Sequence, residues 1–187
     1  MDLSCSSSSS LLVSLLVVLL LAAGSSSQSP SVTKPSDLVR KICPRTANRD
    51  LCLKIFKADP RSATADVKGL VLIAIDALEA SANQTLDTLG SLVNSTPASP
   101  LKDRYQTCVG NYNAVISNLE TAKKVLLSPD YKSAITPADN AQKNIQSCET
   151  IFLLSPELTI SPKLDVLAHK SLDLARIAGI ILLDFLV

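Results

Sequence analysis

The chain has 187 residues, of which 18 are Lys or Arg and 17 are Asp or Glu, so it is close to electrically neutral. This balance argues against a nucleic-acid-binding domain, which needs a concentrated basic face. Aromatic residues are scarce, with three Phe, three Tyr and no Trp, and leave little for stacking against bases or sugar rings. We therefore expect no nucleic-acid partner and no carbohydrate site built on aromatic side chains.

The N-terminal segment has the pattern of a secretion signal. Leu11–Ala23 contains one polar residue, Ser14, and ends beside the small residue Gly24. This run is shorter than the roughly 20 apolar residues of a membrane span, which favours a signal peptide over residues 1–24 rather than a retained anchor. We predict a secreted protein without membrane contact after cleavage. Residues 25–35, rich in Ser, are predicted to be a flexible segment, and residues 36–187 one domain.

Four cysteines remain after removal of that segment, at Cys43, Cys52, Cys108 and Cys148. An even number in a secreted chain predicts two disulfides, for which three connectivities exist. The short separation of Cys43 and Cys52 favours a local bridge between them, which leaves Cys108 with Cys148. A zinc site is the alternative, but the chain has a single His and its cysteine spacings match no zinc pattern. We expect neither a metal nor another cofactor.

Two Asn-x-Ser/Thr sequons begin at Asn83 and Asn94. Both are candidate N-glycosylation sites, in agreement with secretion. Pro97 directly follows the second sequon and is expected to hinder its use.

Apolar residues recur at the three- and four-residue spacing of amphipathic helices, and strand-like alternation is absent. Short helices over Ser36–Ile42 and Thr46–Lys57 are predicted to form a hairpin over residues 36–58. Four longer helices are predicted over residues 63–187: Ala63–Val93, Leu101–Leu127, one capped by Thr136 with Pro137 at its first position, and one from Ser161 and Pro162 through Phe185. The predicted fold is all-α, an up-down-up-down four-helix bundle with an N-terminal helical hairpin and two disulfides.

No group of residues has the composition of a catalytic site. His169 is the only His, and Asp173 lies one turn further along the same predicted helix. We interpret His169 as an exposed or hydrogen-bonded helix residue and expect no enzyme activity. Asp76 and Glu79 share a helix face, and we interpret them as solvated surface charges.

Seven segments carry a family resemblance: Ile42–Thr46, Leu51–Leu53, Asp59–Ala63, Lys68–Leu70, Leu101–Cys108, Asn111–Tyr112 and Cys148–Glu149. Through them the chain resembles the plant invertase/pectin methylesterase inhibitor family over about Leu38–Val187. The resemblance implies a four-helix bundle with an N-terminal hairpin, and disulfides Cys43–Cys52 and Cys108–Cys148. It also implies a protein of the apoplast or cell wall that inhibits pectin methylesterase or acid invertase in a stoichiometric complex.

Two local features bear on the target enzyme. Invertase-directed family members carry Pro-Lys-Phe in the turn after the second long helix, whereas Ser128–Lys132 of this chain lacks that order. The Asp130-Tyr131 pair is more similar to the pectin methylesterase inhibitors. Lys143 and Thr150, however, stand where those inhibitors typically carry Asp. Our leading hypothesis is inhibition of pectin methylesterase, with acid invertase as the alternative and a non-inhibitory secreted bundle as a further alternative.

The resemblance places the enzyme-binding face on the helices between about Ala63 and Leu154, where it would cover the substrate cleft of the enzyme. The candidate contact residues on that face are Asn111, Ser117, Lys143, Ser147, Glu149 and Thr150. Charged groups in such an interface would make its affinity depend on pH and salt.

Overall fold

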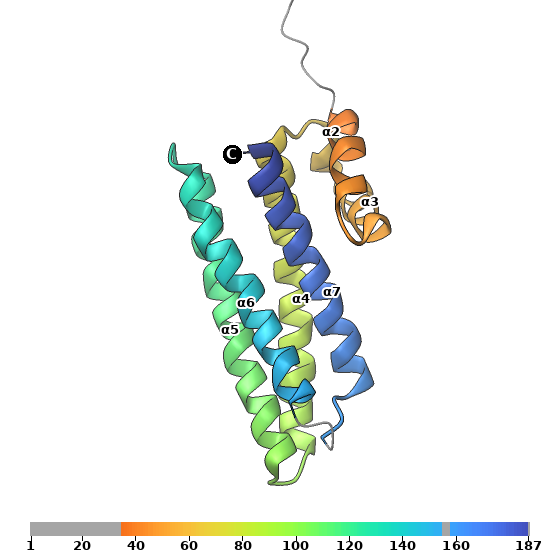
Figure 1. Cartoon of the computed structure of the whole chain (residues 1–187), viewed down its shortest axis with the longest axis vertical. Helices are drawn as coiled ribbons and strands as arrows, with labels where there is room; N and C mark the ends of the chain where they lie inside the picture. Colours follow the sequence, from red (N-terminus) through yellow and green to blue (C-terminus); the bar gives the residue numbers. More distant parts are fainter. Residues whose placement is uncertain (1–34, 155–157, 187) are drawn as a thin grey trace, which may run out of the picture. The chain divides into compact units, whose positions relative to one another are not determined.

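The computed structural model describes residues 35–154 and 158–186, and their regular secondary structure is entirely helical. The predicted signal peptide over 1–24, and nearly all of the segment 25–35, lie outside the described residues. An N-terminal hairpin is formed by α2 (Pro35–Ile42) and α3 (Arg49–Ala58), joined through a 3-10 turn at Cys43–Arg45. The labels are those of Figure 1.

A disulfide between Cys43 and Cys52 closes this hairpin, with an S–S distance of 2.00 Å. Helix α3 begins at Arg49 because the side chain of Asn48 caps it, accepting a hydrogen bond of 3.1 Å from the Leu51 N–H. The predicted start at Thr46 is wrong. Thr46 is buried instead, and its hydroxyl donates to the carbonyl of Cys43 at 2.8 Å.

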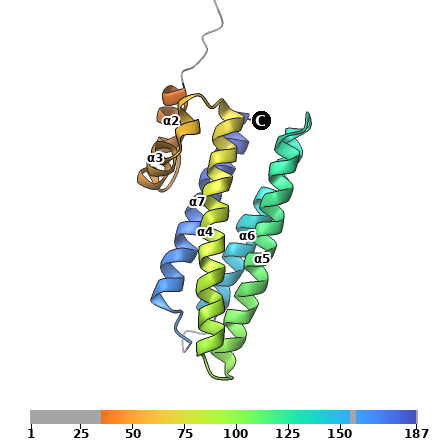
Figure 2. The same cartoon turned by 180° about the vertical axis from the view of Figure 1, so that it is seen from behind.

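Four long helices build the bundle: α4 (Val67–Ser95), α5 (Pro100–Leu126), α6 (Ile135–Leu153) and α7 (Pro162–Ile181). Successive helices run in opposite directions, as Figures 1 and 2 show, which confirms the up-down-up-down prediction. Each packs mainly against two neighbours, in the cyclic order α4, α5, α6, α7. Helix α4 is therefore diagonal to α6.

Two predicted helix starts need correction. Helix α4 starts at Val67 because Asp66 caps it, accepting 2.7 Å from the Gly69 N–H, while Ala63 belongs to a 3-10 segment, Pro60–Ala63. Helix α6 starts at Ile135, so Thr136 is not its cap and Pro137 is its third residue. The 3-10 segment Tyr131–Ala134 leads directly into α6, and no side chain caps it. Pro137 is tolerated there because the first N–H groups of a helix lack intrahelical acceptors.

The C-terminal end of α7 ties the hairpin to the bundle. Helix α7 passes into a π-helical turn, Leu182–Leu186, in which Asp184 lies 2.7 Å from the Arg45 guanidinium. The same guanidinium stands 5.1 Å from the ring centroid of Phe185. Near the middle of α7, Asp173 accepts a hydrogen bond of 2.8 Å from the Asn48 side chain. Among the described residues, no helix has both the length and the apolar character to cross a lipid bilayer.

Candidate partner-binding surface

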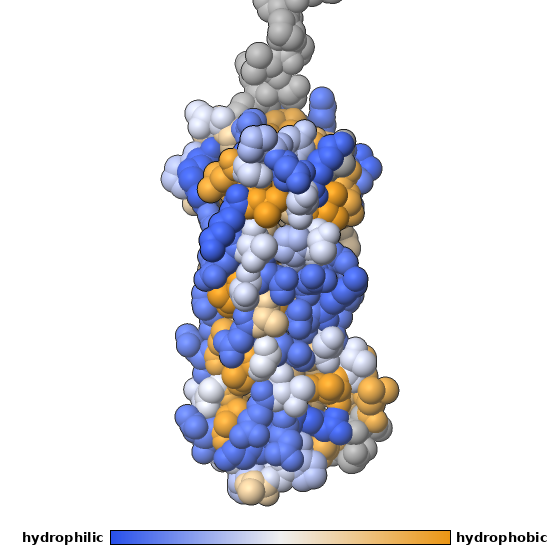
Figure 3. All heavy atoms as spheres, turned by 90° about the vertical axis from the view of Figure 1, so that its left-hand side faces the viewer, coloured by the Kyte–Doolittle hydropathy of each residue, from blue (hydrophilic) through white to orange (hydrophobic). Residues whose placement is uncertain are grey.

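Helices α5 and α6 form the side of the bundle on which the predicted contact residues lie. A disulfide joins Cys108 of α5 to Cys148 of α6, with an S–S distance of 2.05 Å and Cα atoms 4.9 Å apart. Both predicted cysteine pairings are thus confirmed. Figure 3 shows this side, and its middle part is mostly hydrophilic, with hydrophobic residues gathered nearer the two ends.

The predicted contact residues lie on α5 and α6, and three of them share one face of α6. Lys143, Ser147 and Thr150 are exposed and lie four and three residues apart, so they form one stripe along α6. On α5, Ser117 is exposed and Asn111 is half-buried. The six candidates thus differ in accessibility, because Asn111 and Glu149 are half-buried and the other four are exposed.

The polar side chains of this face are held by their own helices. The hydroxyl of Ser147 donates to the Lys143 carbonyl at 2.9 Å, and that of Thr150 to the Gln146 carbonyl at 2.8 Å. The same bond to the carbonyl four residues earlier is made by Thr107, Asn118, Thr121 and Asn144. Because the hydroxyl protons are used internally, these hydroxyls offer their oxygens as acceptors, so the face suits a partner that donates hydrogen bonds.

The charge of Lys143 is also compensated within α6. Its Nζ lies 2.6 Å from the carboxylate of Asp139, one turn earlier, and both side chains are exposed. Such exposed pairs hold their geometry weakly. Lys143 can therefore exchange Asp139 for an acidic group of a partner at little cost.

Glu149 occupies a different environment from the stripe on α6. Its Oε1 is buried and has no hydrogen-bond partner among the described residues. Burial raises the pKa of this carboxyl. The positive charges of His169 and Arg176 on α7 oppose this rise in pKa, and the negative charges of Asp165 and Asp173 reinforce it. Glu149 is therefore half-buried within the electrostatic influence of charged groups on α7, unlike the exposed residues of the stripe.

A buried polar layer lies next to Glu149 in the bundle interior. The hydroxyls of Ser81 and Ser171 hydrogen-bond each other at 2.9 Å across α4 and α7. Tyr112 of α5 is fully buried, and its hydroxyl likewise has no hydrogen-bond partner at normal geometry in the described part of the chain. Burial raises the pKa of Tyr112 to about 12, although Ser171 and Thr85 nearby act in the opposite direction. Tyr112 therefore stays protonated at any physiological pH.

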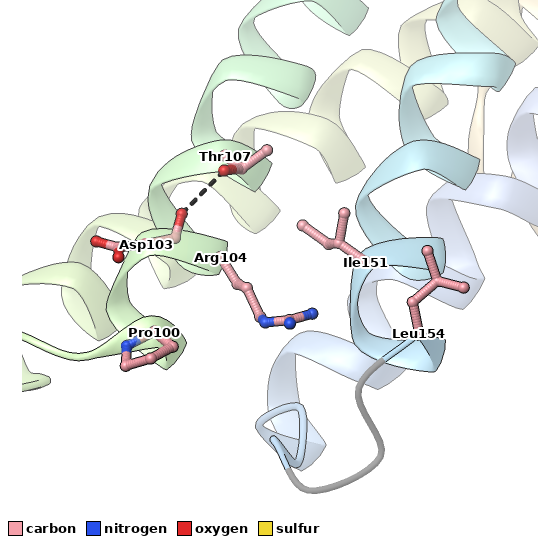
Figure 4. A pocket seen from close by; sticks show the side chains of 6 residues that line it. All are labelled: Pro100, Asp103, Arg104, Thr107, Ile151 and Leu154. Atoms are coloured by element: carbon pink, nitrogen blue, oxygen red, sulfur yellow. Dashed lines mark hydrogen bonds between the residues drawn. The ribbon is translucent and has the colours of Figure 1, made fainter.

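A shallow hollow lies between the beginning of α5 and the end of α6 (Figure 4). The side chain of Arg104 extends from α5 toward Ile151 and Leu154 of α6. Leu154 is 77% exposed and Leu153 beside it 78%, so the hollow borders an apolar patch. Arg is enriched among the residues that anchor protein interfaces, yet none of these residues was among the predicted contact residues. The available signal was the pair Leu153-Leu154 at the end of a helix, where polar residues are usual.

The acidic pair Asp76 and Glu79 is not merely solvated, and that interpretation was wrong. Lys123 of α5 lies 2.7 Å from Asp76 and 2.5 Å from Glu79, and Arg61 bridges Asp76 at 2.8 Å to Asp59 at 2.6 Å. Partial burial would raise the pKa of Asp76, but hydrogen bonds from Lys123 and Arg61 outweigh it and lower that pKa. These ion pairs tie α4 to α5 and to the segment before α4.

His169 is placed as its sequence context suggested. It is exposed, and its Nδ1 lies 2.9 Å from the Asp165 carbonyl, the bond that chiefly raises the pKa of the imidazole. Ser171, two residues after His169 on α7, is buried, and its hydroxyl hydrogen-bonds to that of Ser81. His169 and Ser171 therefore do not face each other. Among the described residues, no cluster of three or more His, Cys, Asp or Glu side chains could hold a metal ion.

These features define a small disulfide-linked helical bundle with a polar face on the helix pair α5 and α6. A family model described as plant invertase/pectin methylesterase inhibitor matches residues 37–178. The chain belongs to this family.

Curated relatives and solved structures agree with the assignment. The chain is 44% identical over 132 residues to a pectinesterase inhibitor of Actinidia deliciosa, covering 71% of each protein. It is 28% identical over 153 residues to cell wall / vacuolar inhibitor of fructosidase 2 of Arabidopsis thaliana, covering 80% of this chain and 83% of that protein. The crystal structure of mutant form A of a pectin methylesterase inhibitor from Arabidopsis superposes with a TM-score of 0.67 at 26% identity, over 77% of this chain and 94% of that one. The predicted fold class is confirmed.

Proposed function

We propose that this protein inhibits pectin methylesterase by forming a stoichiometric complex that covers the active-site cleft of the enzyme. The observation that carries the proposal is the 44% identity to a protein named pectinesterase inhibitor, within a family matched over residues 37–178. The α5–α6 side of the bundle offers a face of hydroxyl and amide groups for such a complex.

The α5–α6 side supplies the proposed contact surface. Its centre is the stripe of Lys143, Ser147 and Thr150, together with the half-buried Asn111 of α5. The hollow at Arg104, lined in part by the apolar side chains of Ile151 and Leu154, lies at one end of this side. Because the hydroxyls of the stripe are already held by their own helix, little side-chain entropy is lost when a partner docks.

The proposal includes secretion and the absence of catalysis by the chain itself. Secretion is supported by the apolar run over residues 11–23 and by the two disulfides, which persist in oxidising compartments. A non-catalytic role is supported by the environment of His169, which is exposed and bound to its own helix. The thiols of Cys43, Cys52, Cys108 and Cys148 are consumed in disulfides.

Acid invertase is the second candidate target, because one relative is named an inhibitor of fructosidase. The turn before α6 bears on this choice. Tyr131 is half-buried and packs against the core, and Asp130 accepts 2.6 Å from the Ser133 hydroxyl. Pro129, Asp130, Lys132 and Ser133 of this turn are exposed, and the turn lacks the Pro-Lys-Phe order of invertase-directed members, which favours pectin methylesterase.

The test is a titration of the purified protein into pectin methylesterase and into acid invertase, in separate activity assays at pH 5–7. We expect loss of esterase activity with an endpoint at one inhibitor per enzyme, and no loss of invertase activity. Inhibition of invertase alone would move the assignment to the second candidate. Loss of neither activity at micromolar protein would leave a bundle with a non-inhibitory role.

A matched pair of variants tests the contact surface. Ser147 on α6 and Ser91 on α4 are both exposed serines whose hydroxyls donate to the carbonyl four residues earlier, at 2.9 and 3.0 Å. Ser147→Arg should weaken inhibition of the esterase at least tenfold by steric and charge mismatch at the interface, about 1.4 kcal/mol. Ser91→Arg should leave inhibition unchanged. Equal effects of the two substitutions would remove the α5–α6 side as the contact surface.

A further inference from the structure

The charge of the chain is distributed unevenly between the hairpin and the bundle. Residues 35–58, which form the hairpin, contain six Lys or Arg and two Asp or Glu, a net charge of +4. Residues 59–187 contain 11 basic and 14 acidic residues, a net charge of −3. The hairpin is therefore a basic unit joined to an acidic bundle, although the chain as a whole is close to neutral.

All six basic side chains of the hairpin are exposed, and four of them have no ion-pair partner in the described part of the chain. Arg40 pairs with Asp37, and Arg45 pairs with Asp184 of the π-helical turn. We call the remaining four the unpaired hairpin cations: Lys41, Arg49, Lys54 and Lys57.

The acidic bundle does not neutralise these cations. One hollow separates α3 from α4 and another separates α3 from α7, and every acidic residue that lines them already has a partner within the chain. These residues and their partners are Asp59 and Asp76 with Arg61, Asp165 with His169, and Asp173 with Asn48 and Arg176. The unpaired hairpin cations therefore keep their charge uncompensated.

Helix α3 turns an apolar side toward the bundle. Leu51 lines the hollow against α7, and Ile55 and Ala58 line the hollow against α4. Lys54 and Lys57 are three residues apart on the same helix, so they share another side of it, and both are exposed. Their ammonium groups are thus available to a partner in solvent.

The hairpin lies on the other side of the bundle from the proposed contact surface. Helix α3 packs against α4 and α7, whereas the stripe belongs to the α5–α6 side. Figures 1 and 2 agree in placing α2 and α3 beside α4 and α7, with α5 and α6 beyond them. A partner bound to the hairpin therefore leaves the α5–α6 side accessible to an enzyme.

The composition of the hairpin indicates the kind of partner. A group of ammonium and guanidinium side chains without acidic counterparts attracts a polyanion. The single aromatic residue of the hairpin, Phe56, is buried, so the hairpin offers no ring for stacking against bases or neutral sugars. Three of the four cations are lysines, whose compact charge suits single carboxylates repeated along a polymer.

We propose that the unpaired hairpin cations bind a linear polymer of uronic acids, and that they hold the inhibitor on pectin whose methyl esters have been removed. The choice of polymer rests on the proposed function. Hydrolysis of a methyl ester by the target enzyme consumes water, releases methanol and a proton, and leaves a carboxylate on the polymer. The affinity of the hairpin for the polymer therefore rises as the esterase works, and the inhibitor accumulates where its target has been active.

The first experiment measures binding of the purified, disulfide-bonded protein to polygalacturonate by affinity electrophoresis. The gel is run at pH 6, where uronic carboxylates are ionised, and without calcium. We expect retardation that weakens as salt rises from about 20 mM to about 200 mM, because salt screens exposed charges. The same polymer with its carboxyl groups methyl-esterified should give no retardation. Equal retardation by the esterified polymer would overturn the proposal.

A matched pair of triple variants locates the site. The hairpin variant carries Lys41→Gln, Lys54→Gln and Lys57→Gln. The bundle variant carries Lys124→Gln, Lys132→Gln and Lys163→Gln, at lysines that are also exposed and without an ion pair among the described residues. Both variants lose the same charge. We expect the dissociation constant for polygalacturonate to rise at least tenfold in the hairpin variant and less than threefold in the bundle variant.

Equal losses in the two variants would show that binding follows net charge alone and would overturn the hairpin site. Arginine at the same three hairpin positions keeps the charge and should retain the affinity. Thermal unfolding of every variant should match that of the natural protein, because exposed, unpaired side chains contribute little to stability. A hairpin variant that folds normally and still binds the polymer as tightly as the natural protein would also overturn the proposal.

Other polyanions are offered at equal charge concentration. Tighter binding to double-stranded DNA or to phosphatidylserine vesicles than to polygalacturonate would overturn the choice of a uronic-acid polymer. The complex of the esterase with the natural protein should be retarded more strongly than its complex with the hairpin variant. Equal retardation of the two complexes would contradict simultaneous use of the two sides of the bundle.

The same proteins separate this inference from the proposed function. The hairpin variant should inhibit the esterase as the natural protein does, since the unpaired hairpin cations lie outside the α5–α6 side. Esterase inhibition without binding to polygalacturonate would overturn the hairpin site and leave the proposed function standing. Binding to polygalacturonate through the hairpin without esterase inhibition would do the reverse.

Discussion

Cys108 and Cys148, forty residues apart in the sequence, lie with their Cα atoms 4.9 Å apart where α5 and α6 pack against each other. This bridge sets the register of the two helices that carry the proposed contact surface. Residues of α5 and α6 therefore keep their relative positions even when the helix ends fluctuate. The stripe on α6 and Asn111 on α5 depend on this register for their common orientation.

Removal of the Cys108–Cys148 bridge should destabilise the bundle more than removal of the hairpin bridge. The first closes a loop of 40 residues and the second one of 9. On the loop-entropy model, Cys108→Ala with Cys148→Ala should lower the free energy of unfolding by about 4 kcal/mol, and Cys43→Ala with Cys52→Ala by about 2.5 kcal/mol. Urea unfolding without reductant measures both. A larger loss from the hairpin pair would contradict the ranking.

Glu149→Gln should stabilise the protein at neutral pH. Burial raises the pKa of Glu149, so the folded state holds this proton more tightly than the unfolded state does. The associated stability is fully present below the unfolded pKa near 4.5 and is lost as pH rises through the higher folded value. The variant should therefore exceed the natural protein in stability at pH 7, and the difference should fade toward pH 4.

Thermal unfolding between pH 4 and 8 measures this dependence. The pKa of His169 is raised as well, so its contribution to stability also falls as pH rises. The variant and the natural protein must therefore be compared with each other at every pH. Glu120→Gln, at an exposed position on α5, is the matched control and should change little. A uniform effect of Glu149→Gln at every pH would indicate a packing change rather than a proton.

Asp76→Asn should destabilise the bundle at neutral pH but not in acid. Hydrogen bonds from Lys123 and Arg61 lower the pKa of Asp76 despite its partial burial. The stability linked to this group is therefore present above pH 3.8 and lost as pH falls through the lower folded pKa. We expect a loss of about 1 kcal/mol at pH 7, since the pairs are partly exposed.

Urea unfolding at pH 7 and pH 3 provides the measurement for Asp76. Asp87→Asn, also on α4 but exposed, serves as control, with an expected change within about 0.5 kcal/mol. If Asp76→Asn cost as much at pH 3 as at pH 7, the ion pairs would not be the source of the effect.

Lys132→Glu should leave inhibition of pectin methylesterase unchanged. Lys132 is exposed in the turn between α5 and α6, at the end of the bundle opposite the hollow at Arg104. Steady-state inhibition assays compare this variant with Ser147→Arg. A loss of esterase inhibition in Lys132→Glu would extend the contact surface to the turn. Any invertase inhibition by the natural protein that this variant removed would identify the turn as the invertase-binding element.

Much of the helical framework could be predicted because its causes are local. The spacing of apolar residues located all four long helices, and Ser161 followed by Pro162 marked the start of α7. The start of α6 was misplaced at Thr136 for the opposite reason. Thr-Pro is a frequent start signal, but the preceding 3-10 segment packs Ala134 into the core and continues the helix from there. Tertiary packing, rather than the local capping preference of Thr136, therefore set the start of α6.

The candidate surface likewise has a part that could be predicted from the sequence and a part that could not. Exposure of Lys143, Ser147 and Thr150 follows from their positions opposite the apolar stripe of α6. The sequence could not show that Glu149 is less exposed than these three residues, because its burial depends on the packing of the helices around it. The hollow at Arg104 needs both α5 and α6, and no sequence pattern reports a surface shared by two helices.

The sequence by itself determined the four long helices and the pairing of the cysteines into one short and one long disulfide loop, because periodicity and cysteine separation are local properties of the chain. Only the tertiary structure decided which charges pair and which are buried. Asp76 meets Lys123 because α4 and α5 pack antiparallel, and the Oε1 of the half-buried Glu149 is enclosed without a hydrogen-bond partner in the described part of the chain. Desolvation and pairing arise between helices, and these contacts exist only once the bundle has formed.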